Sequence, residues 1–279
     1  MKIALIQQHA EEDPARNLDR ALQNMGSARE HGAELAVFPE VALTRFFPHK
    51  QGHSEAAGWA EPIPGPTSDR IAARARELHL ATVFNMYERD ADGRTFDSSP
   101  VFEADGRLLG VSRMVHITDY EGFHEKEYYH PGDRGAAVYS TSVGRVGVAI
   151  CYDRHYPEYM RALGVAGAEV VVIPQAGTVG EWPEGMYEAE VRTAAFQNGY
   201  FAALCNRVGA EETLTFAGES FVTDPEGLIL ARGAALEDEI VLADLDLGAC
   251  RHSTARRLFW RDRRPGLYAD WLGGTGPES

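Results

Sequence analysis

A cysteine at the end of an apolar run is the first residue in the chain that could do covalent chemistry. The run Gly147–Ile150 leads into Cys151, and the polar turn Tyr152–Tyr156 separates it from an expected helix. A thiol in such a turn lies near backbone N–H groups and the positive end of a helix dipole, which lower its pKa and offer oxyanion donors. A cysteine that ends a buried strand is otherwise a small core residue. The charged turn favours a nucleophile at Cys151, whereas Cys205 and Cys250 lack such a turn and are expected in the core.

A carboxylate in a comparable position follows a second apolar run. Glu40 comes directly after Leu35–Phe38 and Pro39, at the end of a predicted strand, where active sites of layered α/β folds collect. Partial burial there would raise its pKa toward the range of a general base. Taken without the cysteine, Glu40 is better interpreted as a glutamate in a surface turn. Together, Cys151 and Glu40 indicate nucleophilic catalysis with a carboxylate that transfers protons.

The elements that must position these residues alternate along the chain between strand-like and helix-like segments. The apolar patterns predict strands at 3–7, 34–38, 80–87, 99–103, 144–151, 169–174, 200–206, 219–223, 228–231 and 240–244. Helices are expected at 14–31, 67–78, 157–166 and 183–198, with Thr67 as the N-cap of the second. This alternation predicts one layered α/β domain over residues 1–246.

Composition excludes several classes of protein. The chain has 279 residues, of which 44% are hydrophobic and 25% charged, which is an ordinary globular balance. Its formal charge of −15 argues against nucleic-acid binding, which needs a basic surface. The three cysteines are too few and scattered for a disulfide framework. We find no signal peptide and no apolar run long enough to span a bilayer, so no membrane partner and a cytoplasmic location are expected.

Three segments of the chain resemble the catalytic segments of the nitrilase superfamily of carbon–nitrogen hydrolases. They are Phe38–Glu40, Arg113–His116 and Ile150–Asp153. Further segments match in the family's order: 60–67, 122–126, 131–133, 206–209 and 263–268. The resemblance therefore covers essentially the whole chain, and it is closest to the N-carbamoylputrescine amidase and β-ureidopropionase branches.

This resemblance implies a four-layer α-β-β-α sandwich and a Glu–Lys–Cys triad. Cys151 would be the nucleophile, and Glu40 would take the thiol proton, pass it to the leaving amine and then activate water. Glu125 matches a second glutamate that helps to position substrate, and the backbone N–H of Tyr152 would be one oxyanion donor. The family needs no metal or other cofactor, and the ten histidines show no ligand spacing.

The lysine of the triad is missing from the sequence. The family has it in an Arg-Lys-x-His segment, where this chain has Arg113-Met114-Val115-His116, and none of Lys2, Lys50 and Lys126 lies nearby in sequence in the right register. Loss of one oxyanion donor typically costs about 3–4 kcal/mol in the barrier. Met114 therefore indicates an engineered lysine-to-methionine variant, a natural low-activity form, or an enzyme that uses Arg113 or another cation. A catalytically silent binding protein on the same fold is a further hypothesis.

Arg154 is the most informative residue for the substrate. Its guanidinium could bind a substrate carboxylate in a bidentate pair, or it could form a structural ion pair with Asp153 or Glu158. The first interpretation predicts an N-carbamoyl amino acid or ureido acid as substrate. Segments 60–67 and 122–126 look more like those of carbamoylputrescine amidases, so N-carbamoylputrescine or an aliphatic amide is the alternative.

Residues 247–279 form a charged extension with several arginines. It is either a solvated tail or an arm that packs across a subunit interface. Members of the family usually pair their sandwiches, which implies a homodimer or a higher homo-oligomer. Besides such copies, the expected partner is a small amide or carbamoyl substrate.

Overall fold

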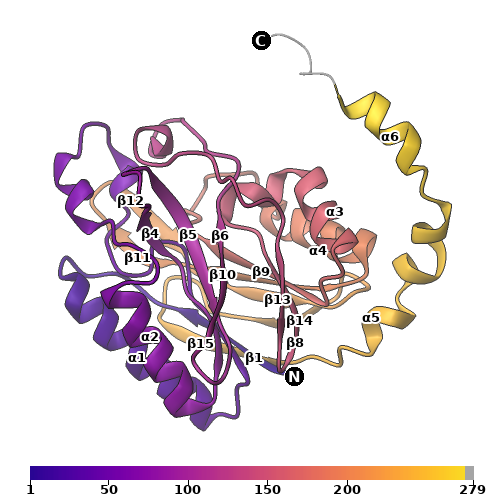
Figure 1. Ribbon diagram of the computed structural model, residues 1–279, viewed down its shortest axis with the longest axis horizontal. Coiled ribbons are helices and arrows are strands. Elements are labelled where there is room, and N and C mark those ends of the chain that lie inside the picture. The colour runs from indigo at the N-terminus through magenta and orange to yellow at the C-terminus, as the bar shows by residue number, and fades with distance from the viewer. Residues whose placement is uncertain (274–279) are drawn as a thin grey trace.

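Two β-sheets lie face to face, and helices cover the outer face of each sheet, in a computed structural model that describes residues 1–273 (Figure 1). The first sheet has seven strands. Their order is β15 (Glu239–Asp244), β1 (Lys2–Gln7), β2 (Leu35–Val37), β3 (Ala81–Val83), β5 (Thr95–Phe102) and β4 (Met86–Arg89), with β6 (Leu108–Arg113) also paired to β5. Strands β1, β2 and β3 are parallel, so their carboxyl ends reach the same edge.

The second sheet has six strands. Their order is β14 (Ile229–Arg232), β13 (Phe221–Thr223), β10 (Phe201–Asn206), β9 (Val170–Gln175), β8 (Gly144–Val148) and β7 (Val138–Thr141). Its central strands β8, β9 and β10 are parallel. A separate hairpin joins β11 (Val208–Glu211) to β12 (Leu214–Ala217).

Side-chain alternation along the strands builds the layers. In β1, Ile3 and Leu5 pack in the apolar cluster shared by the two sheets, whereas Ala4 and Ile6 pack against helix α1 (Pro14–Glu30) and helix α2 (Pro66–Leu78). On the second sheet the outward side chains pack against α3 (Pro157–Val165) and α4 (Met186–Asn198). The fold is therefore the predicted four-layer α-β-β-α sandwich.

Two local predictions about the elements are wrong. The N-cap of α2 is Gly65 rather than Thr67, because Pro66 already occupies the first turn; the Ser68 hydroxyl accepts a hydrogen bond from the Gly65 amide at 2.7 Å. The strand expected over 80–87 is two strands, β3 and β4, separated by Phe84 and Asn85. Both of these residues are fully buried, so an apolar pattern could not reveal the break.

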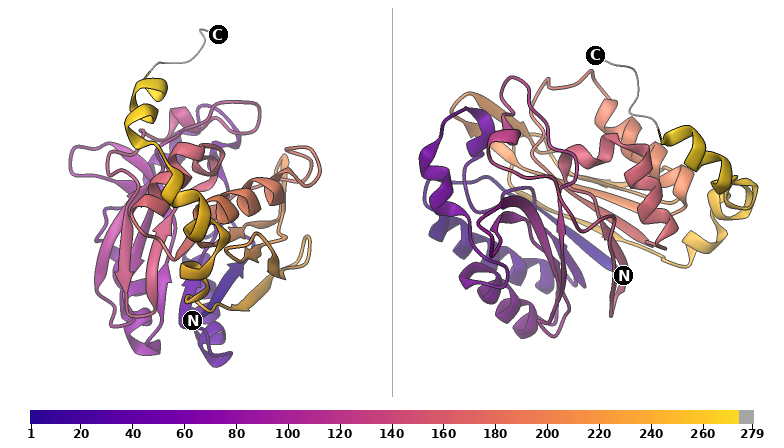
Figure 2. Two further views of the ribbon diagram at one scale, coloured as in Figure 1. Left: turned by 90° about the vertical axis from the view of Figure 1, so that its right-hand side faces the viewer. Right: turned by 45° about the horizontal axis from the view of Figure 1, so that its top comes forward.

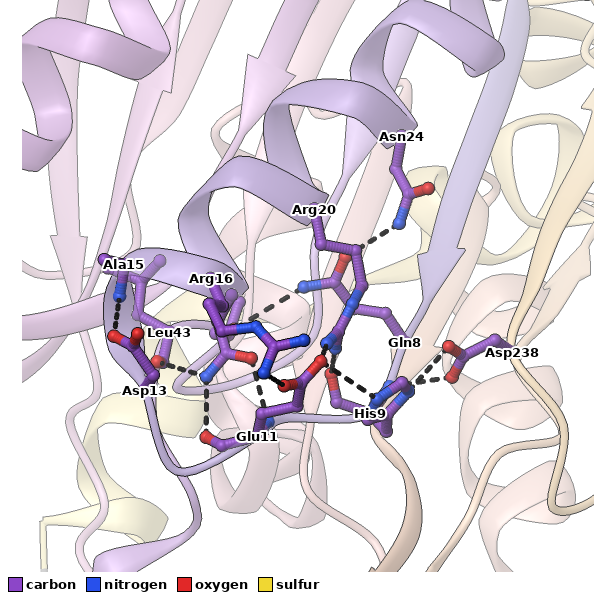
Figure 3. Close-up of polar contacts among 12 residues, drawn as sticks. Gln8, His9, Glu11, Asp13, Ala15, Arg16, Arg20, Asn24, Leu43 and Asp238 are labelled. Atoms are coloured by element: carbon purple, nitrogen blue, oxygen red, sulfur yellow. Dashed lines mark hydrogen bonds and ion pairs between the residues drawn. The ribbon is translucent and has the colours of Figure 1, made fainter.

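The segment after β1 is tied to α1 and to the loop that follows β2 (Figure 3). Arg20 of α1 donates to the carbonyl of His9 at 2.7 Å and pairs with Glu11. Asn17, also on α1, donates to the carbonyl of Leu43 at 2.8 Å. The helix thus supports the stretch of chain just beyond Glu40.

The chain after β15 leaves the sandwich and passes along its α3–α4 side (Figures 1 and 2). It contains α5 (Ala249–His252) and α6 (Pro265–Leu272). Between them, Phe259 packs on Phe196 of α4 with ring centroids 5.4 Å apart, and Trp260 donates to the carbonyl of Asn198 at 3.1 Å. Of the extension predicted over 247–279, residues 274–279 lie outside the described part. No helix within residues 1–273 is long and apolar enough to cross a membrane.

Candidate active site

Cys151 begins a 3₁₀ turn, Cys151–His155, directly beyond β8. Its backbone has a positive φ of 43°, a conformation uncommon for residues other than glycine and concentrated at functional sites. The side chain is 5% exposed, and the Gln175 side-chain amide lies 3.2 Å from its Sγ, as a donor. Gln175 ends β9, the strand parallel to β8, so two adjacent strand ends position the thiol.

Glu40 and Glu125 lie beside this thiol although they are far away in sequence. One carboxylate oxygen of Glu40, one of Glu125 and Sγ of Cys151 all lie within 4.8 Å of one another. Glu40 follows β2 at the facing edge of the first sheet, and Glu125 begins a short 3₁₀ turn. Both side chains are fully buried, and their carboxyl oxygens have no hydrogen-bond partner within residues 1–273. The structure thus brings together three of the residues that the sequence indicated.

The loop that carries Glu40 is held by a buried arginine that sequence reasoning did not single out. Arg207 donates to the carbonyls of Glu40, Val41 and Thr44 at 3.0, 2.6 and 2.9 Å, and to the carboxylate of Glu211 at 2.5 Å. Val41 has a positive φ of 46°, which is unusual for a β-branched residue. These four hydrogen bonds hold the turn in that conformation and fix the direction of the Glu40 side chain.

The protonation of the site differs from the expectation for a thiol near a helix terminus. Burial raises the pKa of Cys151 well above its usual value, and the carboxyl groups of Glu40 and Glu125 raise it further. These effects outweigh any helix dipole, because the turn after Cys151 is short and the thiol is surrounded by acidic groups. The expected lowering of the thiol pKa is therefore wrong, and the thiol needs a base. Burial also raises the pKa of both Glu40 and Glu125.

A third buried carboxyl, Asp97, joins this group and was missed from the sequence. It lies in β5 and is 1% exposed. Its Oδ1 accepts from the Asn85 amide at 2.6 Å, and its negative charge raises the pKa of Glu40. Burial raises the pKa of Asp97 to about 7. The sequence feature that could have revealed Asp97 is an acidic residue placed among apolar and small residues in the strand 95–102.

Met114 is fully buried and follows β6. Its backbone N–H donates to the carbonyl of Asp97 at 3.0 Å, and its side chain belongs to the same apolar cluster as Cys151. No lysine replaces the missing cation: Lys2 and Lys50 pair with surface carboxylates, and Lys126 is exposed.

Arg113 does not take the lysine's place either. Its guanidinium donates to both carboxylate oxygens of Glu88 at 2.9 and 2.6 Å and to Asp133 at 2.9 Å. It also lies over the Phe96 ring, 3.8 Å from the centroid. Because neighbouring residues of a strand face opposite sides, this is the side of β5 away from Asp97. The hypothesis of Arg113 as the replacement cation is therefore wrong.

Arg154 is the cation that acts on the thiol. Its positive charge lowers the pKa of Cys151, against the larger effects of burial and the two glutamates. Nη1 donates to the carbonyl of Cys151 at 3.0 Å and to Gln175 at 2.8 Å. Nε lies 3.4 Å from the Glu190 carboxylate. Nη2 is buried and has no partner within residues 1–273.

A structural ion pair of Arg154 with Asp153 or Glu158, the alternative to a substrate carboxylate, is absent from the described residues, and Glu190 is its carboxylate partner instead. Asp153 instead accepts from the backbone amide of His116 at 3.0 Å and pairs with its ring at 2.7 Å. This contact joins the segment around Met114 to the turn after Cys151. Tyr152, next to the thiol, is half-buried and packs against His155 with ring centroids 4.9 Å apart.

An acidic side chain and two tyrosines lie near the thiol and were also missed. Tyr120 donates to Glu181 at 2.5 Å, and Tyr187 donates to the same carboxylate. Burial raises the pKa of both tyrosines, and the charges of Glu181 and of Cys151 contribute. Tyr187 also stacks on Arg154, with the guanidinium 4.4 Å from the ring centroid. The surroundings of the thiol thus carry groups of both charges.

Glu40, Glu125 and Cys151 are also the one group within residues 1–273 whose donor atoms are close enough to share a metal ion. A buried thiol beside two carboxyls with raised pKa values can equally exchange protons and attack an electrophilic carbon. The four-layer sandwich, with a buried thiol that fits a cysteine nucleophile, is typical of one class of hydrolases.

Comparison with known proteins identifies the family. The profile of the carbon–nitrogen hydrolase family matches residues 2–254, and the chain belongs to this family, within the nitrilase superfamily. It is 32% identical to an N-carbamoylputrescine amidase of Solanum lycopersicum, over 95% of this chain and 93% of that protein. It is 30% identical to a citrullinase of Francisella tularensis, over 96% of each chain. The crystal structure of a carbon–nitrogen hydrolase from Helicobacter pylori G27 superposes with a TM-score of 0.87 at 28% identity, covering 98% of both chains.

Proposed function

We propose that this protein hydrolyses the carbamoyl group of an N-carbamoyl amino acid or another ureido acid. The observation that carries the proposal is the buried cluster of Cys151, Glu40 and Glu125, in which Sγ and one oxygen of each carboxyl lie within 4.8 Å of one another. The fold and the family support hydrolysis of a non-peptide C–N bond. Both named relatives act, by their names, on compounds that carry a carbamoyl group.

In the proposed reaction Cys151 attacks the carbamoyl carbon. The S–H bond breaks as the S–C bond forms; Glu40 takes the proton, and the carbonyl electron pair moves to the oxygen. The backbone N–H of Tyr152 donates to that oxyanion, and Glu125 orients the substrate nitrogen. Glu40 then gives its proton to the leaving nitrogen as the C–N bond breaks, and afterwards activates a water molecule. The products are ammonia, carbon dioxide and the free amine.

Arg154 supports the choice of an acidic substrate. Its Nη2 is buried without a partner in the described chain, while Nη1 is bound near the thiol. A buried donor without a partner is unfavourable, and a substrate carboxylate would satisfy it with a charge-assisted hydrogen bond. The same guanidinium would place the carbamoyl group at Cys151.

N-carbamoylputrescine or a simple aliphatic amide is the second candidate. Glu181 favours it, because a carboxylate held by Tyr120 and Tyr187 could pair with a cationic amine. A silent binding protein is the third candidate, and Met114 favours it, since the site lacks the lysine of the family triad.

One panel separates the three candidates. Ammonia release would be measured with N-carbamoyl-β-alanine, citrulline, N-carbamoylputrescine and a short aliphatic amide, using Cys151→Ser as the inactive control. We expect turnover of the ureido acids and a rise in their KM of at least tenfold in Arg154→Ala. An unchanged KM in that variant would contradict the acidic substrate. Binding without ammonia release from any compound would support the silent protein.

We further propose that the chain forms a homodimer through its C-terminal arm, defined as residues 249–273. Helix α6 exposes Leu267, Trp271 and Leu272, with 47%, 67% and 62% of their surfaces accessible. Exposed apolar residues on one short helix indicate a surface that another chain covers. A second copy is the partner favoured here, because α6 lies away from the sandwich (Figure 2).

A further inference from the structure

The buried acidic groups around the thiol have neither donors nor a cation beside them. Glu40 and Glu125 are fully buried, and their carboxyl oxygens have no hydrogen-bond partner within residues 1–273. Asp97, which is 1% exposed, also keeps its Oδ2 without a partner there. Buried acidic groups are strongly destabilised when nothing donates to them or balances their charge. The cluster therefore fits a cationic occupant.

No side chain of the described part of the chain supplies that cation. Met114 stands where the resemblance places the family lysine, and it packs in the same apolar cluster as Cys151. Arg113 lies on the other side of β5, as shown above. Nη1 of Arg154 donates to the carbonyl of Cys151 and to Gln175, and neither glutamate of the cluster accepts a hydrogen bond from this arginine.

The donor atoms converge as the ligands of a metal ion do. One carboxylate oxygen of Glu40, one of Glu125 and Sγ of Cys151 all lie within 4.8 Å of one another. Ligands of a tetrahedral zinc ion are roughly 3.3–3.6 Å apart, given zinc–sulfur and zinc–oxygen bonds of about 2.3 and 2.0–2.2 Å. Closing the difference, at most about 1.5 Å, breaks no hydrogen bond of either carboxyl, because neither makes one in the described chain.

A thiol beside two carboxyls selects the kind of ion. Sulfur ligands favour zinc over magnesium and calcium, which take oxygen ligands. Three protein ligands leave zinc a fourth position for water. The Gln175 amide, a donor 3.2 Å from Sγ of Cys151, would orient the bound thiolate, as groups just outside the ligands of a metal commonly do.

The three ligands lie on segments that hydrogen bonds hold in place. Arg207 donates to the carbonyl of Glu40 at 3.0 Å, and Arg154 donates to that of Cys151 at 3.0 Å. Two backbone N–H groups that follow Glu125 donate to its carbonyl, each at 2.9 Å. Ligands held in this way lose little freedom when an ion binds.

We propose that Cys151, Glu40 and Glu125 bind one zinc ion, which takes the place of the triad cation and reversibly switches the site off. The switch rests on the proposed hydrolysis and adds its regulation. As the zinc–sulfur bond forms, the S–H proton leaves to solvent, together with any proton on the two carboxyls. The ion then holds the electron pair of the thiolate and the carboxylate of Glu40, so Cys151 cannot attack a carbamoyl carbon. A chelator that removes the ion restores the site.

The first test measures zinc binding without substrate. Tag-free, reduced protein freed of metal would be titrated with zinc, and the ions bound per chain counted by elemental analysis after gel filtration. We expect one ion per chain, and an affinity lower by about a hundredfold or more in Cys151→Ser and in Glu125→Gln. Cobalt used as a probe in place of zinc should give a sulfur-to-metal charge-transfer band that Cys151→Ser lacks.

Two matched variants control for burial alone. Cys250 is 5% exposed, the same fraction as Cys151, but its Sγ donates to the carbonyl of Glu169 at 3.4 Å. Glu103 is 8% exposed, but its carboxylate accepts from Ser142 at 2.8 and 2.5 Å. Cys250→Ser and Glu103→Gln should bind zinc as the unmodified protein does. Equal loss of zinc binding in these controls and in Cys151→Ser, or no stoichiometric zinc in the unmodified protein, would overturn the proposal.

Met114→Lys tests the place of the ion. An ammonium group in the cluster would pair with the carboxyls and repel a second cation, so we expect zinc affinity to fall by roughly a hundredfold or more. Met114→Leu should keep the affinity of the unmodified protein. Undiminished zinc binding in the lysine variant would contradict an ion that takes the place of the triad cation.

The switch is measured on the thiol itself and then on turnover. Zinc should slow alkylation of Cys151 by iodoacetamide at least tenfold, and a chelator should restore the rate; equal rates with and without zinc would overturn the switch. For any compound that the panel shows to be hydrolysed, zinc should stop ammonia release reversibly. Zinc binding with no hydrolysis of any compound would leave the metal site standing and count against the proposed function alone. Hydrolysis by a protein that binds no zinc would do the reverse.

Discussion

At the scale of single residues, the chemistry of the site is set by what surrounds the thiol of Cys151. The pKa of that thiol is raised by burial and by two carboxyls, and Arg154 is the cation that opposes them. Met114 adds apolar volume without a proton or a charge. In the proposed reaction, the thiol would therefore depend on proton transfer to Glu40 during the attack rather than on a preformed thiolate.

Restoring the lysine should increase activity. In Met114→Lys the new ammonium group would enter the cluster of Cys151 and the buried carboxyls, pair with them and donate to the oxyanion. We expect kcat/KM to rise by roughly a hundred- to a thousandfold, the usual contribution of one such donor. Met114→Leu is the control for volume and should show no gain. Unchanged kcat/KM in the lysine variant would contradict a missing donor at residue 114 as the limit on activity.

The free energy of unfolding should depend on pH through the carboxyl group of Asp97. Burial raises its pKa to about 7, above the value in the unfolded chain, so the folded state binds this proton more tightly. The carboxyl consequently destabilises the fold progressively as pH rises from about 4 to about 7, and this loss stays constant at higher pH. Asp97→Asn should raise the free energy of unfolding by up to about 4 kcal/mol at pH 8, from a shift of roughly three pKa units, and by little at pH 4. Denaturant melts at both pH values measure this difference; an equal change at both would contradict it.

At the scale of elements, strand ends and the loops beyond them position the site. Glu40 follows β2 and Cys151 follows β8, and the two strands belong to facing sheets. The sequence predicts both residues because each follows a compact apolar run. Asp97 was not predicted because Asn85 and Glu40, which lie beside it, come from other segments of the chain. No local sequence pattern joins these residues. Short strands such as β11 and β12 were missed for the same reason, since tertiary pairing rather than local pattern defines them.

Arg207 should prove important for both stability and catalysis. Its four hydrogen bonds hold the Glu40 turn and the Glu211 carboxylate in a buried position. A lysine has a single donor group and cannot reproduce this fork. Arg207→Lys should lower the free energy of unfolding by roughly 3 kcal/mol and reduce kcat by misplacing Glu40. Thermal melts and kinetics check this, with Arg232→Lys, at a half-exposed ion pair with Glu188, as a near-neutral control.

At the scale of the whole molecule, the predicted sandwich is found and the C-terminal arm extends beyond it (Figure 1). The arm has contacts with α4 through Phe259 and Trp260, but α6 leaves its apolar side chains exposed. The arginine-rich composition predicted an extension, whereas composition alone could not distinguish a solvated tail from an interface arm. The exposed side chains favour the interface.

Removing the apolar surface of α6 should weaken assembly. We expect sedimentation of the unmodified protein at micromolar concentration to give a dimer or larger, and the double variant Trp271→Ser, Leu272→Ser to shift toward monomer. Leu228→Ser, at a residue 59% exposed on the turn between β13 and β14, should leave the dimer unchanged. A monomer in the unmodified protein would contradict the proposed dimer through the C-terminal arm.

Covalent labelling of the thiol tests the central claim most directly. The intact protein would be incubated with fluoroacetamide, a small amide that can alkylate a nucleophile. Its mass would be measured before and after incubation, and peptide mapping would locate the adduct. The account predicts a single acetamide adduct on Cys151, its loss in Cys151→Ser, and slower labelling in Glu40→Gln. An unmodified mass under excess reagent, or equal labelling of Cys205 and Cys250, would contradict a nucleophile at residue 151.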